Sequence, residues 1–193
     1  MKALLAVLAA VLLTTGCNPT RTVERIDPNQ TVDLSGRWND TDSRLVAQEM
    51  VSDALSRQWL NTWVDVKGKK PVVVVGLVKN RTHELISAET FIKDIEREMI
   101  NSGRVRIVQA GEAREELRDE RADQQQYASP ETAKKWGREL GADFILQGVI
   151  NSIVDSEGND KVVFYQTDLE LTDLETNEKA WIGTKKIKKF VTN

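Results

Sequence analysis

The chain has 193 residues, of which 40% are hydrophobic and 30% charged, and its formal net charge at pH 7 is −3. This composition is typical of one globular domain with a tail, and it excludes collagen, coiled coil and bulk disorder. With one Cys and one His, the chain is also unlike a disulfide scaffold or a multi-Cys zinc protein, and its weak acidity excludes a strongly basic nucleic-acid binder.

The first residues form a targeting signal. Lys2, an apolar run over residues 3–13 and small residues lead to Cys17, the only Cys of the chain. A membrane-spanning helix needs about 20 apolar residues, so residues 1–16 are interpreted as a cleaved signal peptide. The segment before Cys17 resembles the lipobox of bacterial lipoproteins, which implies lipidation of Cys17 and, with Asn18 after it, sorting to the outer membrane. The alternative is a Cys that lies by chance at an ordinary cleavage site.

The segment after Cys17 is interpreted as a tether. Residues 17–32 are polar, contain Pro19 and Pro28, and have neither a helical nor a strand period. A stretched chain gains at most about 3.3–3.6 Å per residue, so this segment limits how far the rest of the protein reaches from the membrane. We expect one globular domain over residues 33–193.

The domain begins with a predicted helix and a buried strand. From residue 40 to residue 63, apolar residues recur at steps of three and four, which predicts one amphipathic helix capped by Asp40 or Thr41. The β-branched run 71–78 predicts a strand covered on both faces, with a loop at 79–84 after it.

The middle of the chain predicts a parallel strand pair and further helices. A helix from the cap Ser87 to the stop at Gly103 is followed by a short strand at 105–108. Strand, helix and strand in this order favour parallel pairing with a right-handed crossover. A highly charged helix is expected over 111–126, and another from Pro130 to Gly141.

The end of the chain predicts three strands. Residues 144–154, 161–173 and 179–191 are strand-like, and the connections at 155–160 and 175–178 carry turn residues. The last three strands therefore form an antiparallel meander. The fold class is α/β (α+β): a single domain with a mixed sheet of about five strands layered with about four helices.

The residues indicate no catalytic chemistry. His83, the only imidazole, falls in the predicted loop after the buried strand, and Cys17 is assigned to lipid. No glycine-rich phosphate loop opens a helix. The acidic segment 155–160 lacks the spacing of a calcium loop and is better interpreted as a hairpin turn. We expect no enzyme activity, no cofactor, no metal and no small-molecule substrate.

Two features are candidates for partner binding. One is a set of basic residues near the C-terminus: Lys179, Lys185, Lys186, Lys188 and Lys189. These lysines either protect a sheet edge against strand pairing or dock an acidic partner or an anionic wall polymer. The other is Trp38, a large aromatic residue between tether and first helix, which either packs back on the domain or meets a partner.

Several segments in a fixed order carry a resemblance to a known family. After the lipobox Cys and the polar tether come 35–42 (SGRWNDTD), 79–82 (KNRT), 141–148 (GADFILQG) and 177–183 (NEKAWIG). Together they resemble the LpoB family, the outer-membrane lipoprotein activators of bifunctional penicillin-binding proteins. The likeness covers most of residues 33–193.

This resemblance implies a non-catalytic protein that is anchored in the outer membrane and faces the periplasm. Such a protein docks on an accessory domain of a penicillin-binding protein and raises its peptidoglycan synthesis, without nucleic acid or cofactor. By residue type and placement, we expect Lys79, Asn80, Arg81, Thr82 and Trp38 to contribute to docking. Equally, Asn80 and Thr82 could simply hold the turn.

One difference from the family leaves a second function open. Familiar members have a longer, Pro-rich tether, whereas residues 17–32 contain two prolines. The alternative is therefore an assembly or structural outer-membrane lipoprotein, related to the curli-secretion or flagellar lipoproteins, that acts by oligomerisation.

Overall fold

A computed structural model describes residues 22–129 and 139–192. The predicted signal peptide, Cys17 and most of the helix expected from Pro130 lie outside the described residues, and residues 139 and 140 at the end of that helix are not helical. Contacts divide the chain into residues 1–30 and residues 31–193, and all described helices and strands belong to the second unit.

A mixed five-stranded sheet forms the centre of this unit, in the order β2-β1-β3-β4-β5. Its strands are β1 (Val72–Arg81), β2 (Arg106–Val108), β3 (Phe144–Glu157), β4 (Asp160–Asp173) and β5 (Lys179–Thr192). β1 pairs in parallel with β2 and β3, while β3, β4 and β5 form an antiparallel meander. The structure confirms the predicted fold class, the parallel pair and the meander.

The first helical region differs from the prediction. α2 (Asp40–Ser56) begins with a capping box in which the Asn39 side chain accepts from the Asp42 N–H and the Asp42 carboxylate accepts from the Asn39 N–H. The cap is therefore Asn39, and the prediction of Asp40 or Thr41 was wrong. A single helix over 40–63 was also wrong, because Arg57 is extended and α3 (Gln58–Lys67) begins after it.

The remaining helices follow the predicted pattern more closely. α4 (Ala88–Ser102) is capped by Ser87, whose hydroxyl accepts from the Thr90 N–H, and it ends at Gly103 with φ 63°. This left-handed residue closes the helix as expected. α5 (Gly111–Tyr127) is highly charged and buries none of its residues.

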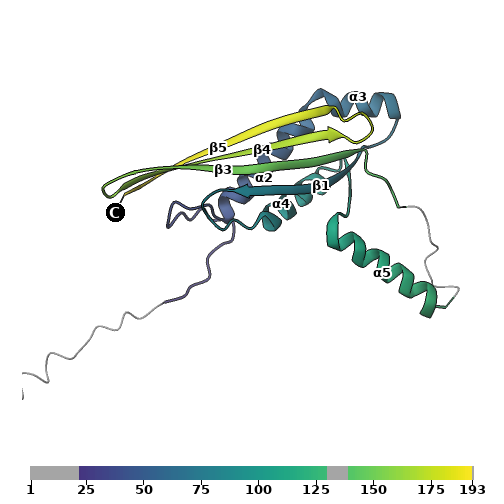
Figure 1. Cartoon of the computed structure of the whole chain (residues 1–193), viewed down its shortest axis with the longest axis horizontal. Helices are drawn as coiled ribbons and strands as arrows, with labels where there is room; N and C mark the ends of the chain where they lie inside the picture. The colour runs from purple at the N-terminus through teal and green to yellow at the C-terminus, as the bar shows by residue number, and fades with distance from the viewer. Residues whose placement is uncertain (1–21, 130–138, 193) are drawn as a thin grey trace, which may run out of the picture. The chain divides into compact units, whose positions relative to one another are not determined.

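The hydrophobic core lies on one face of the sheet, against α2, α3 and α4 (Figure 1). Its buried side chains include Val46, Met50, Leu55, Leu60, Val73, Val75, Val78, Phe91, Ile95, Met99, Phe144, Leu146, Ile150, Leu169, Leu171 and Trp181. On β4 the odd-numbered residues from Val163 to Leu171 are buried, which confirms the predicted period of two.

β1, β3 and β4 extend beyond their predicted bounds. β1 continues to Arg81, so the predicted loop at 79–84 was wrong for its first three residues. β3 and β4 extend to Glu157 and Asp160, and only a two-residue turn joins them. Gly158 has φ 59° there, a conformation that favours glycine, so a tight hairpin replaces the six-residue connection that the sequence suggested.

Candidate docking surface

A β-bulge in β1 decides which side chains leave the core. Val75 pairs with Leu146 and Val78 pairs with Gly148, so three steps along β1 match two along β3. One extra residue reverses the alternation of side chains between the two faces. Val73, Val75 and Val78 consequently all lie in the core.

The reversal sends Lys79 and Arg81 to the face of the sheet opposite α2, α3 and α4. In register with Arg81 lie Asn151, Gln166 and Lys186, one from each of the three following strands. We call this side the open sheet face. It is formed by Leu77, Lys79, Arg81, Gln147, Val149, Asn151, Ile153, Phe164, Gln166, Asp168, Glu170, Ile182, Thr184, Lys186, Lys188 and Phe190.

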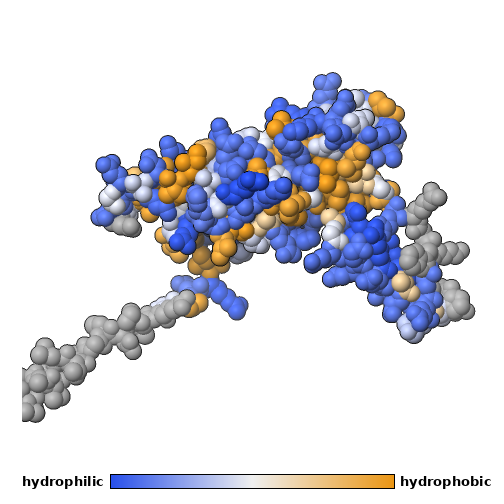
Figure 2. Space-filling model, in the orientation of Figure 1, coloured by the Kyte–Doolittle hydropathy of each residue, from blue (hydrophilic) through white to orange (hydrophobic). Residues whose placement is uncertain are grey.

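The open sheet face combines exposed apolar groups with charges. Leu77, Ile153, Ile182 and Phe190 are 58%, 65%, 60% and 66% exposed. Figure 2 shows apolar and hydrophilic surface alternating along the strands. A shallow hollow of about 380 Å³ lies around Lys79 and neighbouring residues of β3 and β4. Exposed apolar groups beside cations are typical of a protein-binding surface rather than of an active site.

On the open sheet face the carboxylates have hydrogen-bond or ion-pair partners, whereas the cations form no ion pair among the described residues. Asp168 accepts hydrogen bonds from the Gln166 amide (2.9 Å) and the Thr184 hydroxyl (2.6 Å), and Glu170 forms an ion pair with Lys179 (2.7 Å). Within the described part of the chain, Lys79, Arg81, Lys186 and Lys188 form no ion pair. The cations therefore remain available to an acidic partner, whereas these carboxylates are already engaged.

Two of the predicted docking residues hold the turn after β1. The Asn80 amide donates to the Glu84 carbonyl (2.8 Å), and the Asn80 Oδ1 accepts from the Thr82 N–H (2.9 Å) and the Thr82 hydroxyl (2.7 Å). The bulge also places Asn80 on the helix side of the sheet, in register with Ile150. Lys79 and Arg81 thus lie together on the open sheet face, apart from Asn80 and Thr82.

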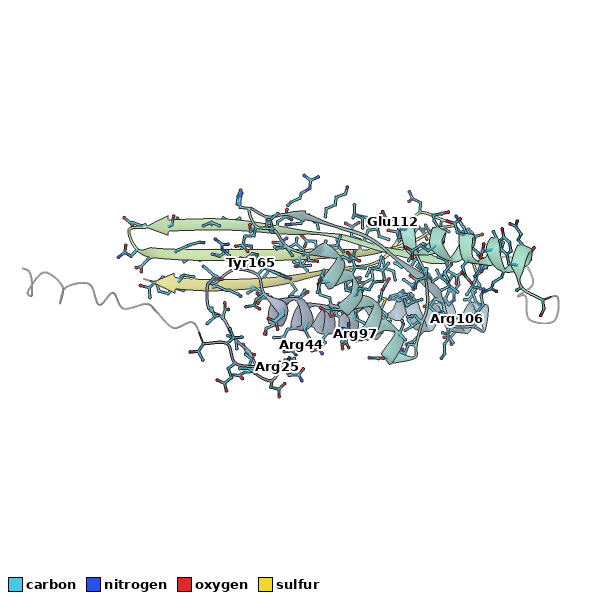
Figure 3. All side chains as sticks on the ribbon, turned by 90° about the horizontal axis from the view of Figure 1, so that it is seen from below. Arg25, Arg44, Arg97, Arg106, Glu112 and Tyr165 are labelled. Atoms are coloured by element: carbon cyan, nitrogen blue, oxygen red, sulfur yellow. The ribbon has the colours of Figure 1, made fainter. Side chains whose placement is uncertain are left out.

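Trp38 packs back on the domain from the lead segment, residues 31–39. Its ring meets Phe91 and Tyr165 edge-on, with centroid distances of 6.1 Å and 5.6 Å. The backbone N–H of Trp38 donates to one carboxylate oxygen of Glu84 (3.0 Å), and the other oxygen accepts from the hydroxyl of Tyr165, labelled in Figure 3, at 2.6 Å. Burial raises the pKa of Tyr165, and the hydrogen bond to Glu84 raises it further. Trp38 therefore lies on the side of the sheet opposite Lys79 and Arg81.

The C-terminal lysines are divided between the two faces of β5, which is an edge strand of the sheet. Lys186 and Lys188 belong to the open sheet face. Lys185 forms an ion pair with Glu49 of α2, and Lys189 is buried against Asp42.

Most of the open sheet face was missed in the sequence. Phe164, Gln166 and Asp168 were not singled out as site residues, although a signal for them exists. The alternation that predicts the buried residues 163–171 also assigns the even-numbered residues between them to the opposite face.

His83 is exposed in the turn between β1 and α4, and its backbone N–H donates to the Ser152 hydroxyl at 3.4 Å. In residues 22–129 and 139–192 no cluster of three or more His, Cys, Asp or Glu could hold a metal ion. Over the same residues, no helix is long and apolar enough to cross a bilayer.

The fold is that of a single α+β domain, and the exposed apolar groups and cations of the open sheet face are suited to contact with another macromolecule. The profile of the family described as "Peptidoglycan-synthase activator LpoB" matches residues 42–187, and the chain belongs to this family. The resemblance noted in the sequence is thereby confirmed, and with it membership of a family of regulators rather than of enzymes.

Solved structures were also compared. The LpoB C-terminal domain from Salmonella enterica is 19% identical, with a TM-score of 0.45, and the match covers 77% of this chain and 99% of that chain. The LpoB C-terminal domain from Escherichia coli is 20% identical, with the same TM-score and the same coverage. A search of curated proteins returned no match.

Proposed function

We propose that this chain is an outer-membrane lipoprotein that binds a bifunctional penicillin-binding protein from the periplasmic side and activates its peptidoglycan synthesis. Membership of the peptidoglycan-synthase activator family supports the proposal. The observation that carries the binding role is the bulge in β1, which turns two cationic side chains away from the core. The protein supplies a surface to the synthase and no reacting groups.

The proposed docking site is the open sheet face. Lys79, Arg81 and Lys186 present unpaired charge, and exposed apolar side chains lie among them. An acidic patch on an accessory domain of the synthase complements such a surface. Complementary charge mainly raises the association rate and selects the partner, while buried apolar contacts hold the complex together.

Activation requires the lipoprotein to distinguish two states of the synthase. A partner shifts an equilibrium only by its differential affinity for the two states. Activation of 5–150-fold corresponds to a preference of about 1–3 kcal/mol for the active state. Binding alone, with equal affinity for both states, would leave synthesis unchanged.

The anchor is proposed at Cys17, with residues 17–32 as the tether. Three acyl chains exceed the two membrane signals that stable anchoring requires. Mass spectrometry of the native protein tests this directly. The mature chain should begin at Cys17 and carry acyl groups, whereas an unmodified thiol at this residue would contradict anchoring.

A capture experiment tests the partner. The full chain, purified in detergent, is immobilised and exposed to a detergent-solubilised cell envelope, together with Arg81→Glu and, as a control outside the open sheet face, Lys69→Glu. We expect the wild type and Lys69→Glu to retain a bifunctional penicillin-binding protein and Arg81→Glu to lose most of it. If no such synthase is enriched on the wild type, the proposed function fails. If Arg81→Glu retains it fully, only the docking site fails.

The assembly alternative is tested by the mass of the same purified chain. An activator that acts on a synthase needs no self-association. A mass by light scattering that rises with protein concentration would favour the oligomerising lipoprotein.

A further inference from the structure

An aromatic cleft lies between α3 and the turn that joins β4 to β5. Its volume is about 600 Å³, and it is lined by rings from Trp59, Trp63 and Phe144 and by charged groups from both walls. Figure 1 shows α3 at the end of the sheet where β4 turns into β5, away from the β3–β4 turn. A volume of this size and an aromatic lining are both typical of sites that bind small ligands.

The three rings form one connected apolar wall. Trp59 and Trp63 both meet Phe144 edge-on, with centroid distances of 5.1 Å and 4.9 Å. The Trp59 Nε1–H donates to the Ala54 carbonyl at the end of α2 (2.7 Å), which fixes that indole. Trp63 lines the cleft, and its buried Nε1–H has no hydrogen-bond acceptor among the described residues. A buried donor without an acceptor is uncommon and calls for an explanation.

The charged groups of the cleft nearly cancel. Lys67 and Lys179 supply two positive charges, and Asp173 and Glu178 supply two negative ones. Lys67 lies over the Trp63 ring at 5.3 Å, and Lys179 is paired with Glu170. Because neither sign dominates, the cleft is better suited to a neutral polar ligand than to an ion.

The carboxylate of Asp173 also keeps the wall of the cleft in shape. It accepts hydrogen bonds from the backbone N–H groups of Glu175 (2.8 Å) and Thr176 (2.9 Å). The turn is therefore held before any ligand enters, and a preformed site loses less conformational entropy on binding.

We propose that this cleft binds a saccharide, and specifically a glycan strand built from N-acetylated amino sugars. A pyranose ring has a face of C–H bonds that carries slight positive charge, which suits the negative face of an indole. Its hydroxyl groups donate to carboxylates, and its acetamido carbonyl accepts from an ammonium group. The choice of glycan rests on the proposed function, since that function places the protein beside peptidoglycan.

Fluorescence titration of the full chain in detergent tests the proposal. The probe is a trimer of N-acetylglucosamine, and the comparison sugar is cellotriose, which has the same linkage without acetamido groups. We expect a saturable change in tryptophan emission with the amino-sugar trimer and weaker binding of cellotriose. Trp63→Leu, which keeps apolar bulk but removes the ring face, should weaken binding about tenfold. Glu178→Gln, at an exposed position that leaves the core intact, should weaken it by a smaller factor.

Lys186→Gln, on the open sheet face, is the control and should bind the trimer as the wild type does. No saturable change at millimolar trimer would overturn the proposal, as would binding that is unchanged in both cleft variants. If these variants instead lose capture of the synthase and no sugar binds, the cleft is a protein contact and the saccharide site is refuted. Synthase capture by the wild type is measured separately, so failure of the sugar site and failure of the proposed function are distinguishable.

Discussion

The Nζ atom of Lys189 on the last strand lies 2.6 Å from the Oδ2 atom of Asp42 in the first turn of α2, and both side chains are buried. The same ammonium group lies 2.8 Å from Asp33 and donates to the Arg37 carbonyl at 3.0 Å. The Lys189 ammonium group has three N–H donors, and Asp42, Asp33 and the Arg37 carbonyl supply one acceptor for each. This contact connects the lead segment, the first helix and the last strand of the domain.

Replacing Lys189 by Met should strongly destabilise the domain. Removal of one partner leaves the Asp42 carboxylate buried without its counter-charge, which costs about 3–5 kcal/mol. Urea unfolding followed by circular dichroism measures the loss. The control is Lys188→Met, because Lys188 is exposed on the opposite face of the same strand and should change the free energy of unfolding by less than about 0.5 kcal/mol. Equal stability of the two variants would contradict the structural role of Lys189.

The same contact predicts how stability depends on alkaline pH. Burial alone would lower the pKa of Lys189, but its hydrogen bonds to Asp33 and Asp42 outweigh burial and raise that pKa. A group with a raised pKa stabilises the fold fully below its unfolded pKa, about 10.4 for lysine, and loses this effect as pH rises through the folded pKa. The wild type should therefore lose stability above about pH 10 more steeply than Lys189→Met. Denaturant unfolding at a series of pH values gives the free energy of unfolding of both proteins. If the wild type and Lys189→Met lose stability in parallel as pH rises, this role of Lys189 is refuted.

Tyr165 should deprotonate only when the domain unfolds. The chain has two tyrosines, and Tyr127→Phe leaves Tyr165 as the only one. Burial and the hydrogen bond to Glu84 raise the pKa of Tyr165, so the folded state retains its phenol proton. In an alkaline titration of Tyr127→Phe, phenolate absorbance should appear in the same step in which circular dichroism reports unfolding. Phenolate formation in the folded domain would mean that Tyr165 is open to solvent.

The lead segment depends on Gly36. This residue has φ +67°, and a Cβ atom there would lie 2.2 Å from Cγ2 of Val191. Gly103 has a similar φ of +63°, and no heavy atom of the described residues lies within 4 Å of its would-be Cβ. Gly103→Ala should therefore cost about 1 kcal/mol from backbone strain alone, whereas Gly36→Ala should cost roughly 1–3 kcal/mol more through the clash. Thermal or urea unfolding measures the loss of stability in each variant. If Gly36→Ala and Gly103→Ala lose the same free energy of unfolding, the lead segment is not packed on β5.

The sequence was sufficient for the fold class because its strongest patterns are local. The β-branched run of β1, the cap Ser87, the stop at Gly103 and the alternation in β4 each reflect a physical preference that operates within a few residues. The break at Arg57 was not predictable in this way, since apolar spacing continues through it into α3. The break is stabilised by a contact after folding, in which the Trp59 indole donates to the Ala54 carbonyl.

The candidate site was predictable only in part for a similar reason. Lys79, Asn80, Arg81 and Thr82 were treated as one loop, so their side chains were expected on one surface. In the structure β1 continues to Arg81, so alternation places Asn80 on the face opposite Lys79 and Arg81, and the bulge before Val78 sets which face each takes. Gly76 within the apolar run indicates a bulge, but the face that each following residue takes depends on the register between β1 and β3, which are far apart in the sequence.

The most direct test of the central claim compares two matched double variants in their binding to, and activation of, a purified bifunctional penicillin-binding protein. Arg81→Gln with Lys186→Gln removes two charges from the open sheet face, and Lys69→Gln with Lys185→Gln removes two charges elsewhere. We predict that the first pair weakens binding about tenfold and lowers stimulation of glycan-chain polymerisation, while the second pair behaves as the wild type does. Equal binding and equal stimulation by both pairs would contradict docking through the open sheet face.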